Sequence, residues 1–85
     1  MTTKDITIAL KSGLGAGPVA LFVQVASQYD SSVYVEYENK KVNAKSLMGM
    51  MSLGIDTGEQ VKISADGSDA DAAVEAIEKY LAAQA

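Results

Sequence analysis

Ser46 is the residue in this chain whose type and position best support covalent chemistry. It lies in the segment Asn43–Ile55, NAKSLMGMMSLGI, where Lys45 and Ser46 precede a short run of methionine and leucine bracketed by glycines. A serine before such a run predicts a helix N-cap, because its hydroxyl accepts a hydrogen bond from a helix amide that has no other partner. The same position suits a phosphate, which free helix amides and the helix dipole stabilise. The residues alone leave capping and phosphorylation both open.

The chain has no histidine, cysteine or arginine, and this limits its chemistry. A nucleophile and its base would have to come from serine, lysine or carboxylates, and the sequence shows no such grouping. Without thiols there is neither a disulfide framework nor a thiolate metal site. The chain is therefore expected not to be an enzyme and to use no cofactor and no metal.

Two further clusters have weaker claims to chemistry. The glycine-rich run Ser12–Pro18 fits neither the dinucleotide fingerprint nor the phosphate loop, which needs a lysine after its last glycine. The carboxylates Asp66, Asp69 and Asp71 resemble a cation site in outline. Because they lie in a turn and at the start of a predicted helix, capping is the better interpretation.

The charge balance argues against nucleic acid as a partner. Seven lysines stand against eleven acidic residues, which gives a formal net charge of −4. Phosphate backbones need clustered basic side chains, and only Lys40, Lys41 and Lys45 lie close together in the sequence. No stretch approaches the ~20 apolar residues of a membrane-spanning helix, and the N-terminal residues lack the apolar run of a signal peptide. A cytoplasmic protein with no direct nucleic-acid contact and no membrane insertion is expected.

The hydrophobic patterns predict a single domain over residues 1–85. Apolar residues alternate in four segments and recur at helical spacing in three others. Strands buried on one face are typical of an antiparallel sheet covered by helices on one side. The expected fold is α+β: an open-faced two-layer β-sandwich, a four-stranded antiparallel sheet with three helices on one face, in the order βαββαβα. The expected strands are 6–10, 33–37, 41–43 and 61–65, and the expected helices are 16–28, 46–53 and 70–81.

Finer features follow from the same patterns. A short turn is predicted at Asn39 and Lys40, and either Ser68 or Asp69 is predicted to cap the last helix. The buried faces expected of the first and last helices consist of Val19, Phe22, Val23 and Ala26, and of Ala70, Val74, Ile77 and Leu81.

Together these features resemble the HPr family, the small phosphocarriers of the bacterial sugar phosphotransferase system. The resemblance covers essentially the whole chain. It lies in SGLGAGPVALFVQVAS after the first strand, KKVNAKSLMGMMSLGI in the middle, VKISADG in the last strand, and the acidic start of the final helix. The Gram-positive branch is the nearer match, because it has a regulatory serine at the position of Ser46.

The chain departs from the family at the relay site. The family's first helix opens with a histidine that accepts phosphate from Enzyme I, followed two residues later by an arginine that contacts several partners. Gly15 and Gly17 stand at these positions. Glycine has no atom that can be phosphorylated, so the resemblance implies a chain that cannot relay phosphoryl groups to sugar permeases. It shares this property with the Crh proteins, HPr-like regulators that lack the histidine and keep the serine.

The resemblance also implies partners. Ser46 is expected to be phosphorylated by an HPr kinase/phosphorylase, and the modified chain is expected to bind a catabolite-control transcription repressor. Enzyme I and sugar permease domains are expected to meet this chain by docking only. The implied docking surface consists of Ala16, Ala20, Leu21, Gln24, Lys45, Leu47, Met48 and Met51. A helix of two turns cannot bury every side, so some of its leucine and methionine side chains must face outward.

Two other interpretations stay open at this point. The chain could be a phosphocarrier, natural or engineered, whose relay site has been replaced while its fold and docking face remain. It could also be an unrelated small domain that binds a metabolite, which ligand-dependent thermal stabilisation without any effect of the kinase would favour.

Overall fold

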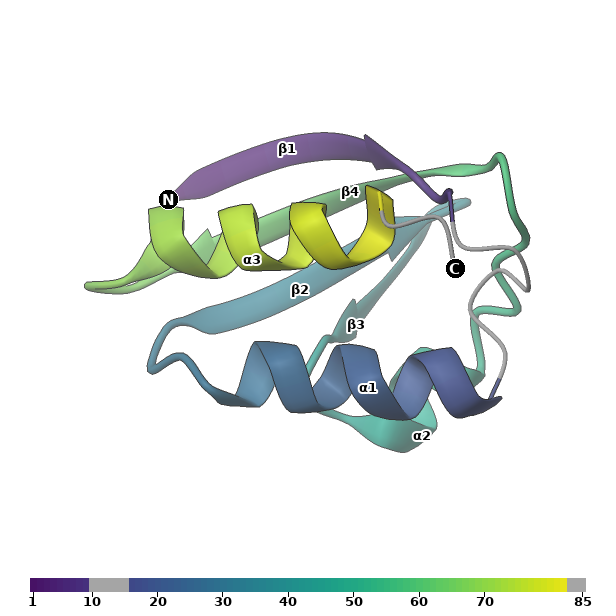
Figure 1. The fold of residues 1–85 in the computed structure, drawn as a ribbon, viewed down its shortest axis with the longest axis horizontal. Coiled ribbons are helices and arrows are strands. Elements are labelled where there is room, and N and C mark those ends of the chain that lie inside the picture. Colours follow the sequence, from purple (N-terminus) through teal and green to yellow (C-terminus); the bar gives the residue numbers. More distant parts are fainter. Residues whose placement is uncertain (10–15, 83–85) are drawn as a thin grey trace.

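This computed structural model describes residues 1–9 and 16–82. Within these residues the chain forms a four-stranded antiparallel sheet with three helices on one face (Figure 1), as the sequence predicts. The elements follow the chain in the order β1 (Thr2–Thr7), α1 (Ala16–Ser27), β2 (Ser32–Tyr37), β3 (Lys40–Asn43), α2 (Leu47–Met51), β4 (Gln60–Asp66) and α3 (Ala70–Ala82).

The sheet places the first strand beside the last. Its order is β1-β4-β2-β3, so β4 lies in the interior and pairs with β1 on one side and β2 on the other. Ile63 lies opposite Lys4 of β1 and opposite Val35 of β2. Val35 in turn lies opposite Val42 of β3. This register directs the apolar residues of the two central strands to the face that the helices cover.

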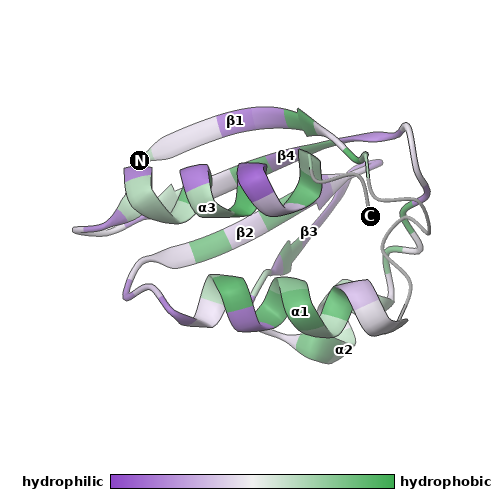
Figure 2. Cartoon of the chain, in the orientation of Figure 1, coloured by the Kyte–Doolittle hydropathy of each residue, from purple (hydrophilic) through white to green (hydrophobic). Residues whose placement is uncertain are grey.

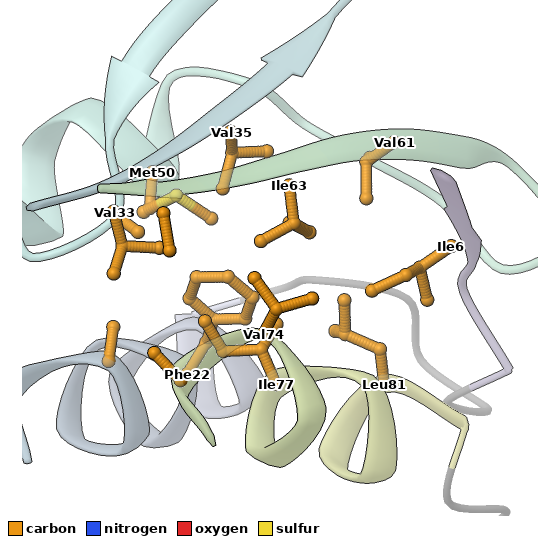
Figure 3. Close-up of a cluster of buried hydrophobic side chains, with 14 of the residues drawn as sticks. Ile6, Phe22, Val33, Val35, Met50, Val61, Ile63, Val74, Ile77 and Leu81 are labelled. Carbon is orange, nitrogen blue, oxygen red and sulfur yellow. The ribbon is translucent and has the colours of Figure 1, made fainter. Parts of the chain in front are cut away.

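The core fills the space between the sheet and the helices. Val33, Val35 and Ile63 point from the sheet toward Phe22 of α1 and Ile77 of α3 (Figure 3), and all five side chains are fully buried. The predicted buried face of α3 is confirmed along its length, and that of α1 is confirmed except at Val23, which is half-buried. Edge-to-face packing of the Phe22 and Tyr80 rings, with centroids 6.5 Å apart, joins the two long helices.

The first strand begins earlier than the apolar alternation predicts. It runs from Thr2 to Thr7 rather than over 6–10, and Leu10 lies outside the described residues. Thr2 and Lys4 lie on the side of β1 that faces α3, where their polar groups bind Asp71 and Glu78. Because polar partners replace apolar burial in this half of β1, hydrophobic periodicity could not locate it.

The turn between the second and third strands lies one residue earlier than predicted. Glu38 and Asn39 both have positive φ, 48° and 66°, and Tyr37 pairs directly with Lys40. Two such residues are typical of a type I′ hairpin turn, whose twist matches that of the strands. The turn is therefore Glu38–Asn39, one residue before the prediction, and Lys40 belongs to β3.

The second helix is shorter than predicted. It ends at Met51 instead of continuing to Leu53, and Ser52 forms its C-cap. The Ser52 hydroxyl donates to the carbonyl oxygen of Gly49 at 2.6 Å, which satisfies one carbonyl of the last turn.

The uncovered face of the sheet carries alternating charges. Asp5 lies opposite Lys62, Lys62 lies opposite Glu36, and Glu36 lies opposite Lys41. The carboxylate of Glu36 and the ammonium of Lys41 are 4.0 Å apart. Opposite charges at neighbouring cross-strand positions favour this register over a shifted one. Among the described helices none has the length and apolar character needed to cross a bilayer.

Candidate functional site

Ser46 lies immediately before α2 as its N-cap, which confirms the predicted capping role. Its backbone is extended, with φ −99° and ψ 111°, and its Oγ accepts a hydrogen bond from the amide of Gly49 at 3.2 Å. A Cβ atom at position 49 would lie only 3.3 Å from this Oγ, so the glycine leaves room for the hydroxyl. The residue is exposed. The hydroxyl is therefore held at a helix start and remains open to solvent.

A hydrogen-bonded turn fixes the backbone that carries Ser46. The amide of Ser46 donates to the carbonyl oxygen of Asn43 at 3.0 Å, and the amide of Lys45 donates to Asn43 Oδ1 at 2.8 Å. Between them, buried Ala44 donates its amide to the carbonyl oxygen of Val33 at 2.8 Å. The serine is therefore anchored to the sheet through the end of β3.

Lys45 is half-buried, and its ammonium is directed at the protein itself. Lys45 Nζ donates to the backbone carbonyl oxygen of Tyr29 at 2.7 Å. Tyr29 follows the end of α1, where carbonyl groups lack helical partners and a cation is favourable. The sequence predicts a partner-facing lysine, and the structure gives this ammonium an internal contact that the sequence did not suggest.

Apolar side chains on α2 remain exposed. Leu47, Met48 and Met51 are 44%, 84% and 52% exposed, whereas Met50 is 1% exposed and belongs to the core. These values confirm that the short helix turns part of its apolar surface outward. One side of α2 packs inward, and nothing in the described structure covers its other side.

The neighbouring helix extends this surface. Helices α1 and α2 are in contact, and Leu21 of α1 is 52% exposed. Ala20 and Gln24 are exposed as well, while Ala16 begins α1 and Gly15 lies outside the described residues. We call the exposed residues of this region the helical face; it consists of Gly17, Ala20, Leu21, Gln24, Leu47, Met48 and Met51.

The helical face carries no formal charge. Neither α1 nor α2 contains a lysine or an acidic residue, although charged residues make up 21% of the chain. In Figure 2 both helices are mostly in the green of hydrophobic residues, in contrast to the purple segments of the strands and α3. A Cβ atom at Gly17 would meet no other atom within 4 Å, so this position is open space where a side chain could stand.

The carboxylates predicted to cap α3 have other partners. Asp69 accepts hydrogen bonds from the amides of Asp30 and Ser31, both at 2.9 Å, and from the Ser31 hydroxyl. Asp71 accepts from the hydroxyl of Thr2. Asp69 directly precedes α3 and Asp71 lies in its first turn, as predicted. Their side chains also join α3 to the loop after α1 and to β1. No three of the described carboxylates gather as ligands for a metal ion.

Hydrogen bonds between side chains shift pKa values at two places in the described structure. The Ser31 hydroxyl, followed by the Asp30 amide, lowers the pKa of Asp69. The hydroxyl of Tyr37 donates to Glu59, which lowers the pKa of that carboxyl and raises the pKa of the tyrosine. Both carboxylates are bound to groups elsewhere in the fold, so the shifts reflect structural links rather than a proton-transfer site.

Comparison with known proteins agrees with this geometry. A family model described as "PTS HPr component phosphorylation site" matches residues 2–83. The HPr-like protein Crh of Bacillus subtilis is 46% identical over 81 residues, which cover 95% of each chain.

Solved structures of relatives share the fold. The crystal structure of HPr-C-His from Thermoanaerobacter tengcongensis aligns with a TM-score of 0.91 at 51% identity, over 95% of this chain and 91% of that one. The phosphocarrier protein HPr of Bacillus anthracis aligns with a TM-score of 0.92 at 46% identity, over 94% and 95% of the two chains. The interpretation of this chain as an unrelated metabolite-binding domain is therefore wrong. The chain belongs to the HPr family, and it is a member whose sequence contains no histidine.

Proposed function

We propose that this chain is a regulatory member of its family, switched by phosphorylation at Ser46. An HPr kinase/phosphorylase adds the phosphate in the cytoplasm, and the modified chain docks on a catabolite-control transcription repressor. The chain is a substrate of the kinase and has no catalysis of its own. The observation that carries the proposal is the exposed Ser46 hydroxyl beside an uncharged apolar face, in a chain without histidine.

The environment of Ser46 favours a phosphate. The N-cap position places the new charge beside amide groups at the start of α2, where an anion is stabilised by hydrogen bonds and by the helix dipole. The hydroxyl is exposed, so a kinase can reach it without opening the fold. Phosphorylation then adds about −1.5 to −2 charges at the edge of a face that has none.

The helical face supplies the contact area for the repressor. Leu21, Met48 and Met51 are each more than half exposed, and flexible methionine side chains adapt to a partner's shape. The resemblance implies an arginine at the position of Gly17, and its absence removes a positive charge from the docking surface. The bound repressor is therefore expected to be held by apolar contact and by the phosphate.

Phosphorylation by a Gram-positive HPr kinase with ATP tests the proposal directly. Intact mass followed by peptide mapping is expected to show one added phosphate, located at Ser46. The variant Ser46→Ala should gain none, whereas Ser52→Ala, which alters the other serine next to α2, should gain one. The phosphorylated chain should then bind the repressor more tightly than the unmodified chain. An unmodified protein beside an authentic HPr that is modified in parallel would overturn the proposal.

A relay-dead phosphocarrier is the second candidate. It is favoured by the close alignment with two HPr structures, at TM-scores of 0.91 and 0.92. In this case the helical face still docks on Enzyme I and sugar permease domains, without phosphoryl transfer. Incubation of the Gly15→His variant with Enzyme I and its phosphoryl donor separates the two candidates. A regained phosphohistidine would support a carrier surface that has lost only its acceptor, whereas failure to regain it would favour the dedicated regulator.

A further inference from the structure

The sulfur atoms of this chain are concentrated on one short helix. The sequence contains four methionines and no cysteine. Three of the methionines lie within α2, at positions 48, 50 and 51, and the fourth is Met1. Any oxidation of sulfur in this protein must therefore occur at thioethers, and mainly on α2.

The three helical methionines differ sharply in exposure. Met48 is 84% exposed and Met51 is 52% exposed, whereas Met50 is 1% exposed. Met48 and Met51 are three residues apart, so they lie on the same side of the helix. Met50 points instead into the core, near Val33 and Val35 (Figure 3). Solvent therefore reaches two methionine side chains of α2 and not the third.

We propose that Met48 and Met51 form a peroxide-sensitive modification site on the helical face, and that their oxidation weakens docking. Each thioether sulfur donates an electron pair to one peroxide oxygen. A sulfur–oxygen bond forms as the oxygen–oxygen bond breaks, and water leaves after proton transfer within the peroxide. The sulfur is oxidised by two electrons and the peroxide is reduced by two, which leaves methionine sulfoxide.

The position of these sulfurs gives the oxidation its effect. Methionine sulfoxide is polar, and burying a polar group without a hydrogen-bond partner is unfavourable. Neither α1 nor α2 has a charged side chain that could interact with the new sulfoxide oxygen. A partner that covers this face by apolar contact would therefore have to desolvate the sulfoxide. The effect on docking rests on the proposed function, whereas the order in which the methionines are oxidised does not.

Oxidation by hydrogen peroxide tests the site itself. Peptide mapping over time should show that Met48 reacts first and Met51 second. Met50 should react on the order of ten times more slowly than Met48, because its sulfur is reached only when the fold opens locally. Met1 is 79% exposed and lies outside α2, so it serves as an internal reference for a freely accessible thioether. Equal rates at Met48, Met50 and Met51, with circular dichroism still native, would overturn the proposal.

Binding after oxidation tests the consequence. The chain is phosphorylated at Ser46 first, and its affinity for a catabolite-control repressor is measured before and after peroxide treatment. We expect at least about a fivefold loss, comparable to the cost of one unsatisfied polar group. The matched double variant Met48→Leu with Met51→Leu keeps an apolar face, and its own affinity for the repressor, measured before peroxide treatment, should be unchanged by that treatment, although Met1 is still oxidised. Treatment of the oxidised wild type with reductases for both sulfoxide epimers should restore its affinity for the repressor.

The two proposals fail in different ways. If the unoxidised chain gains no phosphate at Ser46, the proposed function is wrong, and the oxidation order still decides whether Met48 and Met51 form the accessible site. If the phosphorylated chain binds the repressor with the same affinity before and after oxidation, the proposed effect of the sulfoxides is wrong while the regulatory function stands.

Discussion

Asp69 shows how one side chain can connect parts of the fold that are distant in sequence. Its carboxylate accepts from two backbone amides and one hydroxyl of the loop between α1 and β2. Ser31, which supplies an amide and the hydroxyl, is 1% exposed. Without this carboxylate, the buried polar groups of Ser31 would need another partner. The carboxylate therefore holds the start of α3 against the end of α1.

The pKa of Asp69 predicts a pH-dependent contribution to stability. Because hydrogen bonds from Ser31 and Asp30 lower the folded-state pKa, the carboxylate stabilises the fold above its unfolded pKa of about 3.9. This contribution is lost as the pH falls through the lower, folded-state pKa. Urea unfolding at pH 7 and pH 3 should show Asp69→Asn less stable than the wild type at pH 7, with a smaller difference at pH 3. Asp30→Asn, which keeps the donating amide, is the control. Equal stability of Asp69→Asn and wild type at pH 7 would show that the link contributes nothing.

At the scale of elements, the segment that follows β4 passes very close to the loop after α1. Gly67 lies between β4 and α3, with Ser31 directly against it. A Cβ atom at position 67 would lie 2.7 Å from the Ser31 Cα and 2.5 Å from its Oγ. Backbone atoms cannot move away as a flexible side chain can, so the two segments require a glycine here.

Two glycine substitutions should therefore have opposite effects. Gly67→Ala is expected to lower the free energy of unfolding by about 2 kcal/mol or more, through overpacking against Ser31. Gly17→Ala lies in α1 with open space around it and is expected to raise stability by about 0.5 kcal/mol, because alanine favours the helix. Chemical denaturation of both variants checks the pair. Similar effects of the two substitutions would contradict the distinction between a close approach and a free helix position.

Much of the element order could be predicted from the sequence, because apolar periodicity reports burial. Phe22 and Ile77 mark helix faces in this way, and Val35 marks a strand. The start of β1 could not be predicted, since Thr2 and Lys4 are held by polar groups of α3 instead of by the core. Long-range polar pairing leaves no local pattern in the sequence.

In the candidate site, too, local features could be predicted from the sequence, and contacts between separate elements could not. The Ser46 cap is local and was predicted from its neighbours, whereas the contact of Lys45 with the Tyr29 carbonyl joins separate elements and was not. Which of Met48, Met50 and Met51 points inward depends on where α2 lies against the sheet and α1. Spacing on the helix could divide these residues into sides, but it could not say which side was buried.

At the scale of the whole molecule, one aromatic ring connects the layers. Phe22 is fully buried, lies among side chains from β2 and β4 in Figure 3, and packs edge-to-face on Tyr80. A domain of 85 residues has a small core, and total stabilities of such domains are commonly about 5–15 kcal/mol. Removal of the Phe22 ring is therefore expected to cost a large share of the total free energy of unfolding.

Phe22→Ala is expected to lower the free energy of unfolding by about 3–5 kcal/mol, with a correspondingly large fall in the thermal midpoint. Leu21→Ala alters the adjacent residue of the same helix, but its side chain is 52% exposed, so the expected change is within about 0.5 kcal/mol. Thermal unfolding followed by circular dichroism compares the two variants. A similar loss of stability in both variants would contradict the assignment of Phe22, and not Leu21, to the core.

The strand order also has a consequence for synthesis of the chain. The first strand pairs with the last, so that Ile6 lies opposite Val61, and among the described residues β4 is the only strand beside β1. A ribosome makes β1 first and must add β4 before the two can join. The β2–β3 hairpin can close earlier, because its partners are adjacent in the chain. During translation the N-terminal strand therefore stays without its sheet partner until β4 has been made.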